Sequence, residues 1–362
     1  MSNTRSSPDL MRAARQEYST ALLATHSALQ DRVQCKSDST LAAVMLLSMY
    51  ETITCRSPDL MGRWINHVQG ATKLIEMRDV QQLQTPTGLQ LFSQIRIQIA
   101  LGHIFYKKHA PPVVVQLSKV AAAHRDGGSE KTEDFFNILV QVSNLSAEIR
   151  ANANSESSFR SPAPFIQKAF QLDIDLVSWV MSIHPASRYT IASVYCNENK
   201  KDDSEYRSVY GESHHVYPNV EIASMWNNYR LTRIIIHEII GNIYVRLLKP
   251  GGPSEDRLMA LRSIAISRQM AEDICASVPY HFNSEDVATG SVFRLIWPLY
   301  IASDCVGSSP PLKQWIAQTL EKIGHTMGIQ QALTMSQLVK EETGLSWLSR
   351  ELDTIEGNME SI

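Results

Sequence analysis

Closely spaced cysteines are absent from this sequence of 362 residues. No C-x-x-C pair and no zinc-ligand spacing occurs among its five cysteines, Cys35, Cys55, Cys196, Cys275 and Cys305. Their odd number and wide separation are typical of reduced thiols rather than of a disulfide framework, which favours a cytosolic or nuclear setting. The sequence therefore predicts no metal site and a cytoplasmic location.

Long hydrophobic runs are missing as well. The longest, 113–115 and 234–236, are far shorter than the roughly 20 apolar residues that span a bilayer. The first eight residues contain no apolar core of a signal peptide. We expect a soluble protein that has no membrane partner.

An excess of positive charge is the third feature that the sequence lacks. Lysine and arginine total 34 against 37 aspartates and glutamates, which gives a formal net charge of −3. Proteins that bind nucleic acids by neutralising phosphates usually carry a basic excess or a basic stripe. We expect no nucleic-acid partner.

Hydrophobic residues are plentiful, and their spacing is helical. They make up 44% of the chain and recur at intervals of three and four residues along most of it. Only the segment 188–196 alternates as a strand does, and Asp38 is expected to cap a helix over 41–50. The pattern predicts an all-α multi-helix bundle that forms a single domain over 1–362.

Polar stretches interrupt this pattern and are expected to be loops. They cover residues 124–132, 150–162 and 197–219. The last of them is charged and poor in apolar residues other than tyrosine. It is expected to be either a solvated surface loop or a lid over a binding site.

The segment 221–248 is expected to be the central helix, because it is apolar on most of its sides. Arg230, Arg233, His237 and Glu238 lie within it, and burying them without partners would cost considerable free energy. Either they pair with one another and with buried carbonyls, or some of them line a cavity.

Part of this helix is similar to a known family. Trp226-Asn-Asn-Tyr-Arg-Leu-Thr-Arg-Ile-Ile-Ile-His-Glu resembles the W-N-x-Y-R-x-x-R-I-x-x-x-E helix of the fungal-specific transcription factor domain. That family forms the all-helical regulatory region of zinc-cluster regulators. Further segments resemble its motifs in the same order, namely 41–51, 64–71, 273–281, 296–302 and 323–332. The resemblance covers about residues 15–340.

The sequence also departs from that family. Its six-cysteine zinc cluster, basic linker and coiled coil are missing from these 362 residues. We therefore expect a stand-alone copy of the regulatory domain, without the module that reads base edges. Because one fold hosts many functions, the resemblance alone does not assign an activity.

Known catalytic signatures are missing too. The sequence contains no G-x-G-x-x-G, no G-x-x-x-x-G-K-[ST], no H-E-x-x-H and no G-x-S-x-G. His237-Glu238 lacks the second histidine that a zinc-binding helix needs. No nucleotide, flavin or metal cofactor is implied.

The candidate site residues are aromatic and polar side chains of the family-like helices. Tyr229, Arg233 and His237 are the predicted catalytic groups. The predicted substrate-binding residues are Trp64, His67, Trp226, Arg230, Tyr280, Trp297 and Tyr300. Such residues can line an apolar pocket with a few directed donors. They can equally be core residues that pack against and satisfy one another.

Three functional hypotheses remain open. The first is a cofactor-independent cyclase or pericyclase of fungal secondary metabolism, performing for example a Diels–Alder or hetero-Diels–Alder reaction on a reactive apolar metabolite by positioning and hydrogen bonding. The second is a ligand-sensing transcriptional regulator that acts through protein partners, which would be nuclear. The third is a DNA-binding regulator whose zinc-cluster module lies upstream. A homodimer is compatible with each.

Overall fold

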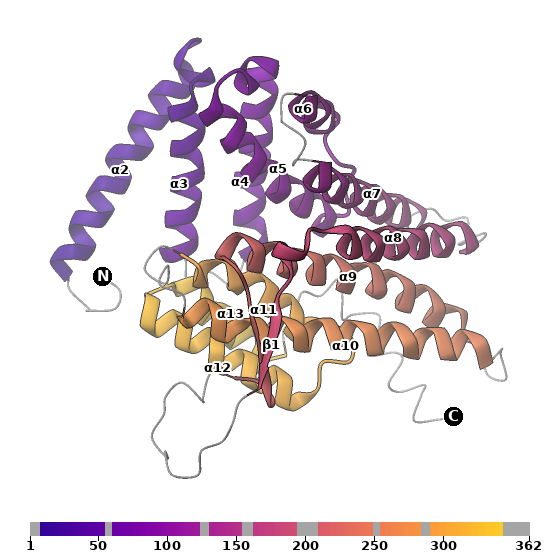
Figure 1. Ribbon diagram of the computed structural model, residues 1–362. Helices are drawn as coiled ribbons and strands as arrows, with labels where there is room; N and C mark the ends of the chain where they lie inside the picture. Colours follow the sequence, from indigo (N-terminus) through magenta and orange to yellow (C-terminus); the bar gives the residue numbers. More distant parts are fainter. Residues whose placement is uncertain are drawn as a thin grey trace. The chain divides into compact units, whose positions relative to one another are not determined.

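The computed structural model describes residues 8–54, 60–123, 130–153, 162–193, 209–248, 254–283 and 290–342. Helices account for most of these residues (Figure 1). The described residues also include strands, which form one two-stranded sheet. The prediction of an all-α multi-helix fold is confirmed. Among the described helices, none combines the length and the apolar character that crossing a membrane requires.

The described residues cluster into two compact units. Unit 1 comprises those of Met1–Ser161 and Gly324–Gln331, and unit 2 comprises those of Pro162–Ile323 and Ala332–Ile362. All residues of the central helix belong to unit 2. That the chain is a single domain over 1–362 stays a prediction.

Unit 1 is a series of helices in which neighbours along the chain pack together. Its elements are α2 (Pro8–Gln30), η1 (Gln34–Lys36), α3 (Asp38–Thr54), α4 (Leu60–Arg78), η2 (Asp79–Leu83), α5 (Pro86–Phe105), α6 (Pro112–Ala123) and α7 (Glu130–Ala153). Helices α2, α3 and α4 lie side by side in Figure 1, and α5 packs against α4 and α7. Helix α7 extends into the ends of two segments that were predicted to be loops, 124–132 and 150–162. The rest of those segments lies outside the described residues, except Pro162, which precedes the first residue of the next helix.

The start of α3 corrects one detail of the sequence analysis. Ser37, not Asp38, caps the helix, because its Oγ accepts the backbone N–H of Thr40 at 3.2 Å. The Asp38 carboxylate binds the guanidinium of Arg78 and accepts a hydrogen bond from Thr85 Oγ1. A carboxylate engaged by a buried arginine is no longer available to cap its own helix.

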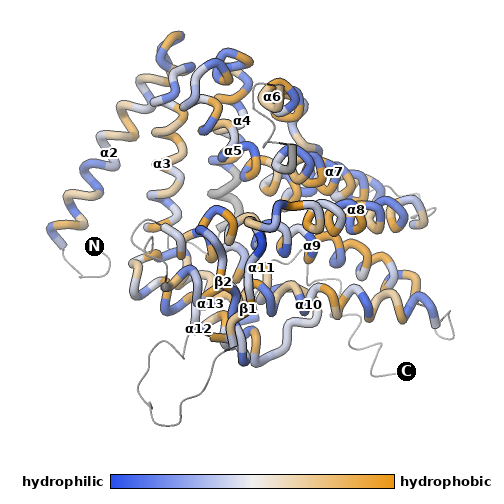
Figure 2. The backbone as a smooth tube through the Cα atoms, in the orientation of Figure 1, coloured by the Kyte–Doolittle hydropathy of each residue, from blue (hydrophilic) through white to orange (hydrophobic). Residues whose placement is uncertain are grey.

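Unit 2 is built around two long helices. Its elements are α8 (Ala163–Ser182), η3 (Pro185–Ser187), β1 (Thr190–Ser193), β2 (Ser213–Val216), α9 (Val220–Leu247), α10 (Ser254–Asn283), η6 (Val292–Leu295), α11 (Ile296–Asp304), α12 (Pro310–Met327) and α13 (Gln330–Lys340), the last two of which pass briefly into unit 1. Figure 1 shows α9 lying between α8 and α10, and contacts join it to both. Along α10, hydrophobic stretches are interrupted by hydrophilic ones in Figure 2, as expected for a helix with one buried face.

Helix α9 is the predicted central helix, and its burial is confirmed. Asn219 caps it, since its Oδ1 accepts the backbone N–H of Ile222 at 2.8 Å. Most of its side chains are buried, including Arg230, His237 and Glu238. Unit 2 must therefore satisfy these charged groups inside its core.

A small hairpin corrects the prediction of a loop over 197–219. Strand β1, which falls within the strand-like segment 188–196, pairs antiparallel with β2, with Thr190 opposite Val216 and Ser193 opposite Ser213. The pattern of β2, Ser-His-His-Val, is too polar to be recognised as a strand from sequence. Residues 197–208, about half of the predicted lid, lie outside the described residues.

Candidate functional site

Four charged or titratable residues of α9, of which Arg233 is partly exposed and the others are buried, belong to three different groups of unit 2. Arg230 lies in one, Arg233 and His237 lie in a second around Asp173, and Glu238 lines a cavity. We call these the Arg230 cluster, the Asp173 cluster and the Glu238 cavity.

The Arg230 cluster holds a fully buried guanidinium that forms no ion pair with any residue of the described ranges. Nη1 donates to Tyr217 Oη at 2.7 Å and to Asn227 Oδ1 at 2.9 Å, and Nη2 lies 3.1 Å from His215 Nδ1. Arg230 is only 1% exposed. Its hydrogen-bond acceptors are therefore neutral groups of α9 and of the segment around β2.

Aromatic rings complete the surroundings of this cation. The guanidinium carbon lies 5.1 Å from the ring centre of Tyr189 and under 6 Å from those of Tyr217 and Trp226. Such cation–π contacts favour arginine over lysine. The cluster anchors the β1–β2 hairpin to α9.

The electrostatics of the cluster keep its histidine and its tyrosine neutral. Burial, and then the charge of Arg230, lower the pKa of His215 to about 3. Burial raises the pKa of Tyr217 to about 12. His215 therefore accepts a hydrogen bond from Arg230 as a neutral imidazole throughout the physiological pH range.

The Asp173 cluster joins α8 to α9 through one carboxylate. Arg233 Nε donates to Asp173 Oδ1 at 2.8 Å, and Arg233 Nη1 lies 3.3 Å from Tyr229 Oη. His237 Nε2 is 3.3 Å from Asp173 Oδ2, close enough for an ion pair but without hydrogen-bond geometry. Burial alone would raise the pKa of Asp173, but His237 and Arg233 outweigh it and lower the pKa to about 2.

Ser263, His237 and Asp173 resemble a Ser–His–Asp arrangement only in residue type. His237 Nδ1 lies 3.4 Å from Ser263 Oγ. Ser263 is 3% exposed and sits inside α10, where the neighbouring backbone N–H groups are taken up by the helix. The helical N–H groups beside its hydroxyl are therefore not available to stabilise an oxyanion, so this arrangement of described residues does not support acyl transfer.

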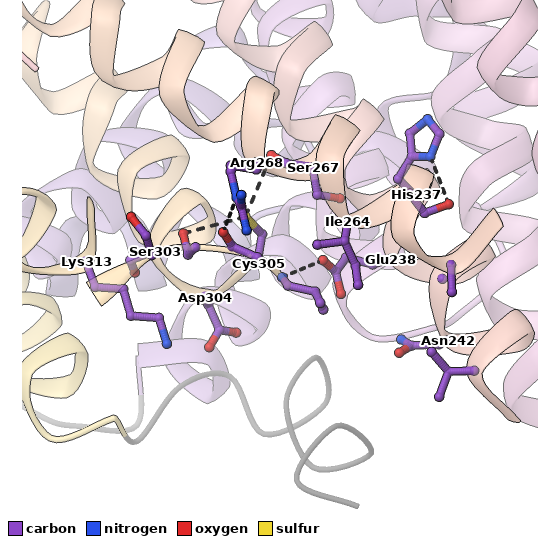
Figure 3. Close-up of a pocket in the computed structure, with 18 of the residues that line it drawn as sticks. His237, Glu238, Asn242, Ile264, Ser267, Arg268, Ser303, Asp304, Cys305 and Lys313 are labelled. Atoms are coloured by element: carbon purple, nitrogen blue, oxygen red, sulfur yellow. Dashed lines mark hydrogen bonds between the residues drawn. The ribbon is translucent and has the colours of Figure 1, made fainter. Parts of the chain in front are cut away.

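The Glu238 cavity has a volume of about 740 Å³. Its walls come from α9, α10, the segment from Tyr300 to Pro310, and residues of α12 and α13. Figure 3 shows Glu238 among its lining residues, with Asn242 one helical turn further along α9. A site of this size matches the range of about 300–1,000 Å³ that is usual for small-molecule pockets.

Glu238 is the most unusual group in this cavity. Oε1 accepts the backbone N–H of Val306 at 2.8 Å, whereas Oε2 is buried and has no hydrogen-bond partner among the described residues. The residue is 3% exposed. Burial raises the pKa of Glu238 to about 8, and the nearby Asp304 carboxylate contributes. Glu238 is therefore largely protonated near neutral pH.

The loop after α11 shapes the cavity wall opposite α9. Gly307 has φ +91°, and a Cβ there would lie 2.6 Å from Ile264 Cγ2 of α10, so glycine is required by both conformation and space. Cys305 is buried beside it, and burial raises the pKa of its thiol far above the usual range. A thiol held in that state is a poor nucleophile.

The structure separates the residues that the sequence predicted to share a site. Of the predicted residues, His237 and Tyr300 line the Glu238 cavity. Tyr229 and Arg233 belong to the Asp173 cluster, and Trp226 and Arg230 belong to the Arg230 cluster.

The remaining predicted residues lie elsewhere. The Tyr280 ring contacts that of Tyr217 at 5.3 Å between centres, and Trp297 contacts Tyr300 at 6.2 Å. His67, in unit 1, lies 2.9 Å from Glu51. Trp64 is part of α4, but its side chain lies outside the described residues. The catalytic and binding roles of all these residues stay predictions.

Two important groups were not predicted as site residues. Asp173 lies on the buried face of α8, between Ala169 and Leu176, and an acidic residue at such a position is a signal that could have been used. Glu238 was recognised as buried but not assigned to a pocket. Within the described ranges, no three His, Cys, Asp or Glu side chains are grouped as a metal ion would require.

Comparison with known proteins finds a similarity that covers only part of the chain. Residues 1–99 match the family described as the fungal specific transcription factor domain, which confirms the resemblance over that part of the chain. The later segments that resemble the family lie outside this match. No solved structure matches the chain.

One curated relative is similar over a limited length. It is transcription factor dbaG of Emericella nidulans (strain FGSC A4), to which this chain is 27% identical over 143 residues. The similar region covers 35% of this chain and 32% of that protein. The chain thus spans about a third of the length of this relative.

Proposed function

We propose that this protein is a transcriptional regulator that senses a small, mainly apolar molecule and acts through protein partners. The match of residues 1–99 to a transcription factor domain carries the proposal. The relative named as a transcription factor supports it. Such a protein would work in the nucleus.

The Glu238 cavity supports the sensing part of the proposal. It lies in unit 2, where residues of α9, α10, α11, α12 and α13 and of the loop after α11 line it. A ligand there would contact α9 and the loop at once, because Val306 is already bonded to Glu238. Ligand binding would therefore favour one arrangement of this loop, which is the differential contact that a regulatory ligand needs.

The geometry gives the cyclase hypothesis less support. Arg233 and Tyr229 are engaged with Asp173 and with each other, and neither lines the described cavity. Of the three predicted catalytic residues, only His237 lines this cavity, so the structure does not bring the three together around one ligand. That hypothesis, like the possible homodimer, stays a prediction.

The experiment that tests the regulator proposal attaches the chain to a heterologous DNA-binding module in yeast. We expect expression of a reporter to change several-fold relative to the module alone. Deleting the gene in the source organism should change the transcript levels of a defined set of genes. An unchanged reporter together with an unchanged transcriptome would contradict the proposal.

A further inference from the structure

The Glu238 cavity contains a buried polar atom with no partner. Oε2 of Glu238 is shielded from water and makes no hydrogen bond with any described residue. No arginine, lysine or histidine among the described residues forms an ion pair with this carboxyl group. Leaving a buried polar atom unpaired typically costs about 1–3 kcal/mol, so its position calls for an explanation.

The hydrogen-bond pattern identifies which oxygen carries the proton. Oε1 is occupied as an acceptor of the Val306 N–H. Because burial raises the pKa of Glu238 to about 8, the carboxyl group is mostly neutral at pH 7. Its proton then resides on Oε2, which makes Oε2 a donor without an acceptor.

The remaining surroundings are a mixture of apolar side chains and charged groups. Apolar contact comes from Val245, Ala260, Leu261 and Ile264. The titratable and charged groups that face the cavity from every wall are His237, Arg257, Arg268, Tyr300, Asp304, Cys305, Lys313 and Glu342. Of the cations, Arg268 and Arg257 are exposed, and Arg268 Nε donates to the Gly307 carbonyl at 2.8 Å.

We infer that this cavity binds an uncharged, largely apolar molecule whose carbonyl or other oxygen acceptor takes the hydrogen bond from Glu238 Oε2. This inference rests on the proposed sensing function and names the chemical class of the ligand. A carboxylate ligand would force a second negative charge beside Asp304. A primary amine would bind as an ammonium paired with an ionised Glu238, and removing both of these charges from water in a buried site is costly.

Four naphthalene probes of similar size test the ligand class with the 362-residue chain. They are 2-acetylnaphthalene, a ketone; 2-ethylnaphthalene, a hydrocarbon; 2-naphthoate, an anion; and 1-(2-naphthyl)ethylamine, a cation. Equilibrium dialysis at pH 7 measures the affinity of each. We expect the ketone to bind at least about tenfold more tightly than the hydrocarbon, as one additional hydrogen bond in a buried site allows.

Substitutions then assign the difference to Glu238. Glu238→Gln retains an acceptor for Val306 and a donor for the ligand, so it should keep most of the preference for the ketone. Glu238→Leu should reduce that preference to about twofold or less. Glu221 is an exposed glutamate on the same helix. Glu221→Leu is therefore the matched control and should bind the probes as the wild type does.

The pH dependence keeps the inference testable if Glu238→Leu does not fold. The fraction of Glu238 that is protonated falls about elevenfold between pH 6 and pH 9 for a pKa of about 8. Ketone binding should weaken by about tenfold over this range in the wild type and remain nearly constant in Glu238→Gln. A pH-dependence shared by both proteins would show that another of the facing groups titrates.

Several results would overturn the inference. These are equal binding of ketone and hydrocarbon, tightest binding of the amine or the anion, no detectable binding of any probe, or a shared pH-dependence. None of them bears on the reporter experiment, which tests the regulator function without any probe. A result that contradicts the inferred ligand class can thus be distinguished from a result that contradicts the proposed regulator function.

Discussion

Glu238 Oε1 accepts a hydrogen bond from the backbone N–H of Val306 at 2.8 Å, across 68 positions of the sequence. This bond ties the middle of α9 to the loop that follows α11. It also leaves Glu238 Oε2 as the one atom of the carboxyl group that is free to interact with a ligand. The predictions below test this bond and the two clusters that share the helix with it.

Glu238 should make the protein less stable as the pH rises. Its pKa increases from 4.5 to about 8 on folding, so the folded state binds a proton that the unfolded state releases between these values. Between pH 5 and pH 7, wild type should lose about 2 kcal/mol of unfolding free energy relative to Glu238→Gln. Urea denaturation at both pH values measures this, with Glu221→Gln as the control. Parallel pH profiles for wild type and Glu238→Gln would contradict the expected protonation.

Asp173 should have the opposite effect, at acid pH. Its pKa is lowered from 3.8 to about 2 in the folded state, so its stabilising contribution is complete above pH 4 and is lost as the pH falls towards 2. Between pH 7 and pH 3, wild type should lose about 1 kcal/mol more than Asp173→Asn does. Chemical denaturation at the two pH values checks this, and Asp175→Asn on the same helix serves as the matched control.

Replacing Arg230 should strongly destabilise unit 2. Arg230→Met leaves Tyr217, Asn227 and His215 without their buried partner and should cost about 3 kcal/mol or more. Arg230→Lys should restore little, because a compact ammonium group lacks the planar guanidinium that hydrogen-bonds along its edges while its faces contact aromatic rings.

Differential scanning calorimetry measures the effect of these Arg230 substitutions. Arg294→Met is the control, since its side chain is 45% exposed and its pairing with Glu221 at 3.8 Å should be worth at most about 1 kcal/mol. Equal losses for Arg230→Met and Arg294→Met would show that the buried cluster is not a stabilising anchor.

Gly307→Ala should damage the wall of the cavity. The added Cβ would collide with Ile264 in addition to the unfavourable φ of +91°, for a cost of about 1–3 kcal/mol. Gly211→Ala is a close control, because φ is +78° but nothing lies within 4 Å of the added atom. Thermal unfolding should show that both variants are less stable than the wild type. Dialysis with 2-acetylnaphthalene should show a loss of binding in Gly307→Ala alone. Unaltered binding in Gly307→Ala would argue against this loop as part of the site.

The sequence was sufficient to predict the central helix and the presence of charged groups inside it. Hydrophobic periodicity is a local property, so a helix that is apolar on most sides can be predicted from its own segment of the sequence. The partners of the charged groups could not be predicted in this way. Asp173 meets Arg233 across 60 positions, and only the packing of α8 against α9 brings them together.

The hairpin and the cavity show the same limitation. Strand β2 lacks hydrophobic alternation, and contacts of His215 and Tyr217 with Arg230 hold the segment in place. The cavity depends on Gly307 in a loop between α11 and α12, whose position no periodicity specifies. Aromatic residues were predicted to meet in one pocket because they recur on family-like helices, whereas in the structure Trp226 contacts Arg230, Tyr229 contacts Arg233, and Tyr300 lines the Glu238 cavity.

Helix α9 carries Arg230 and Glu238 eight positions apart, and this spacing has a consequence for how the chain can vary in length. Eight residues correspond to two full turns plus about 80° of rotation, so the two side chains point to different surroundings. Inserting or deleting one residue between them would rotate one relative to the other by about 100° and would displace at least one from its partners. We therefore expect natural variants of this segment to differ by substitution and to conserve the number of residues between these two positions.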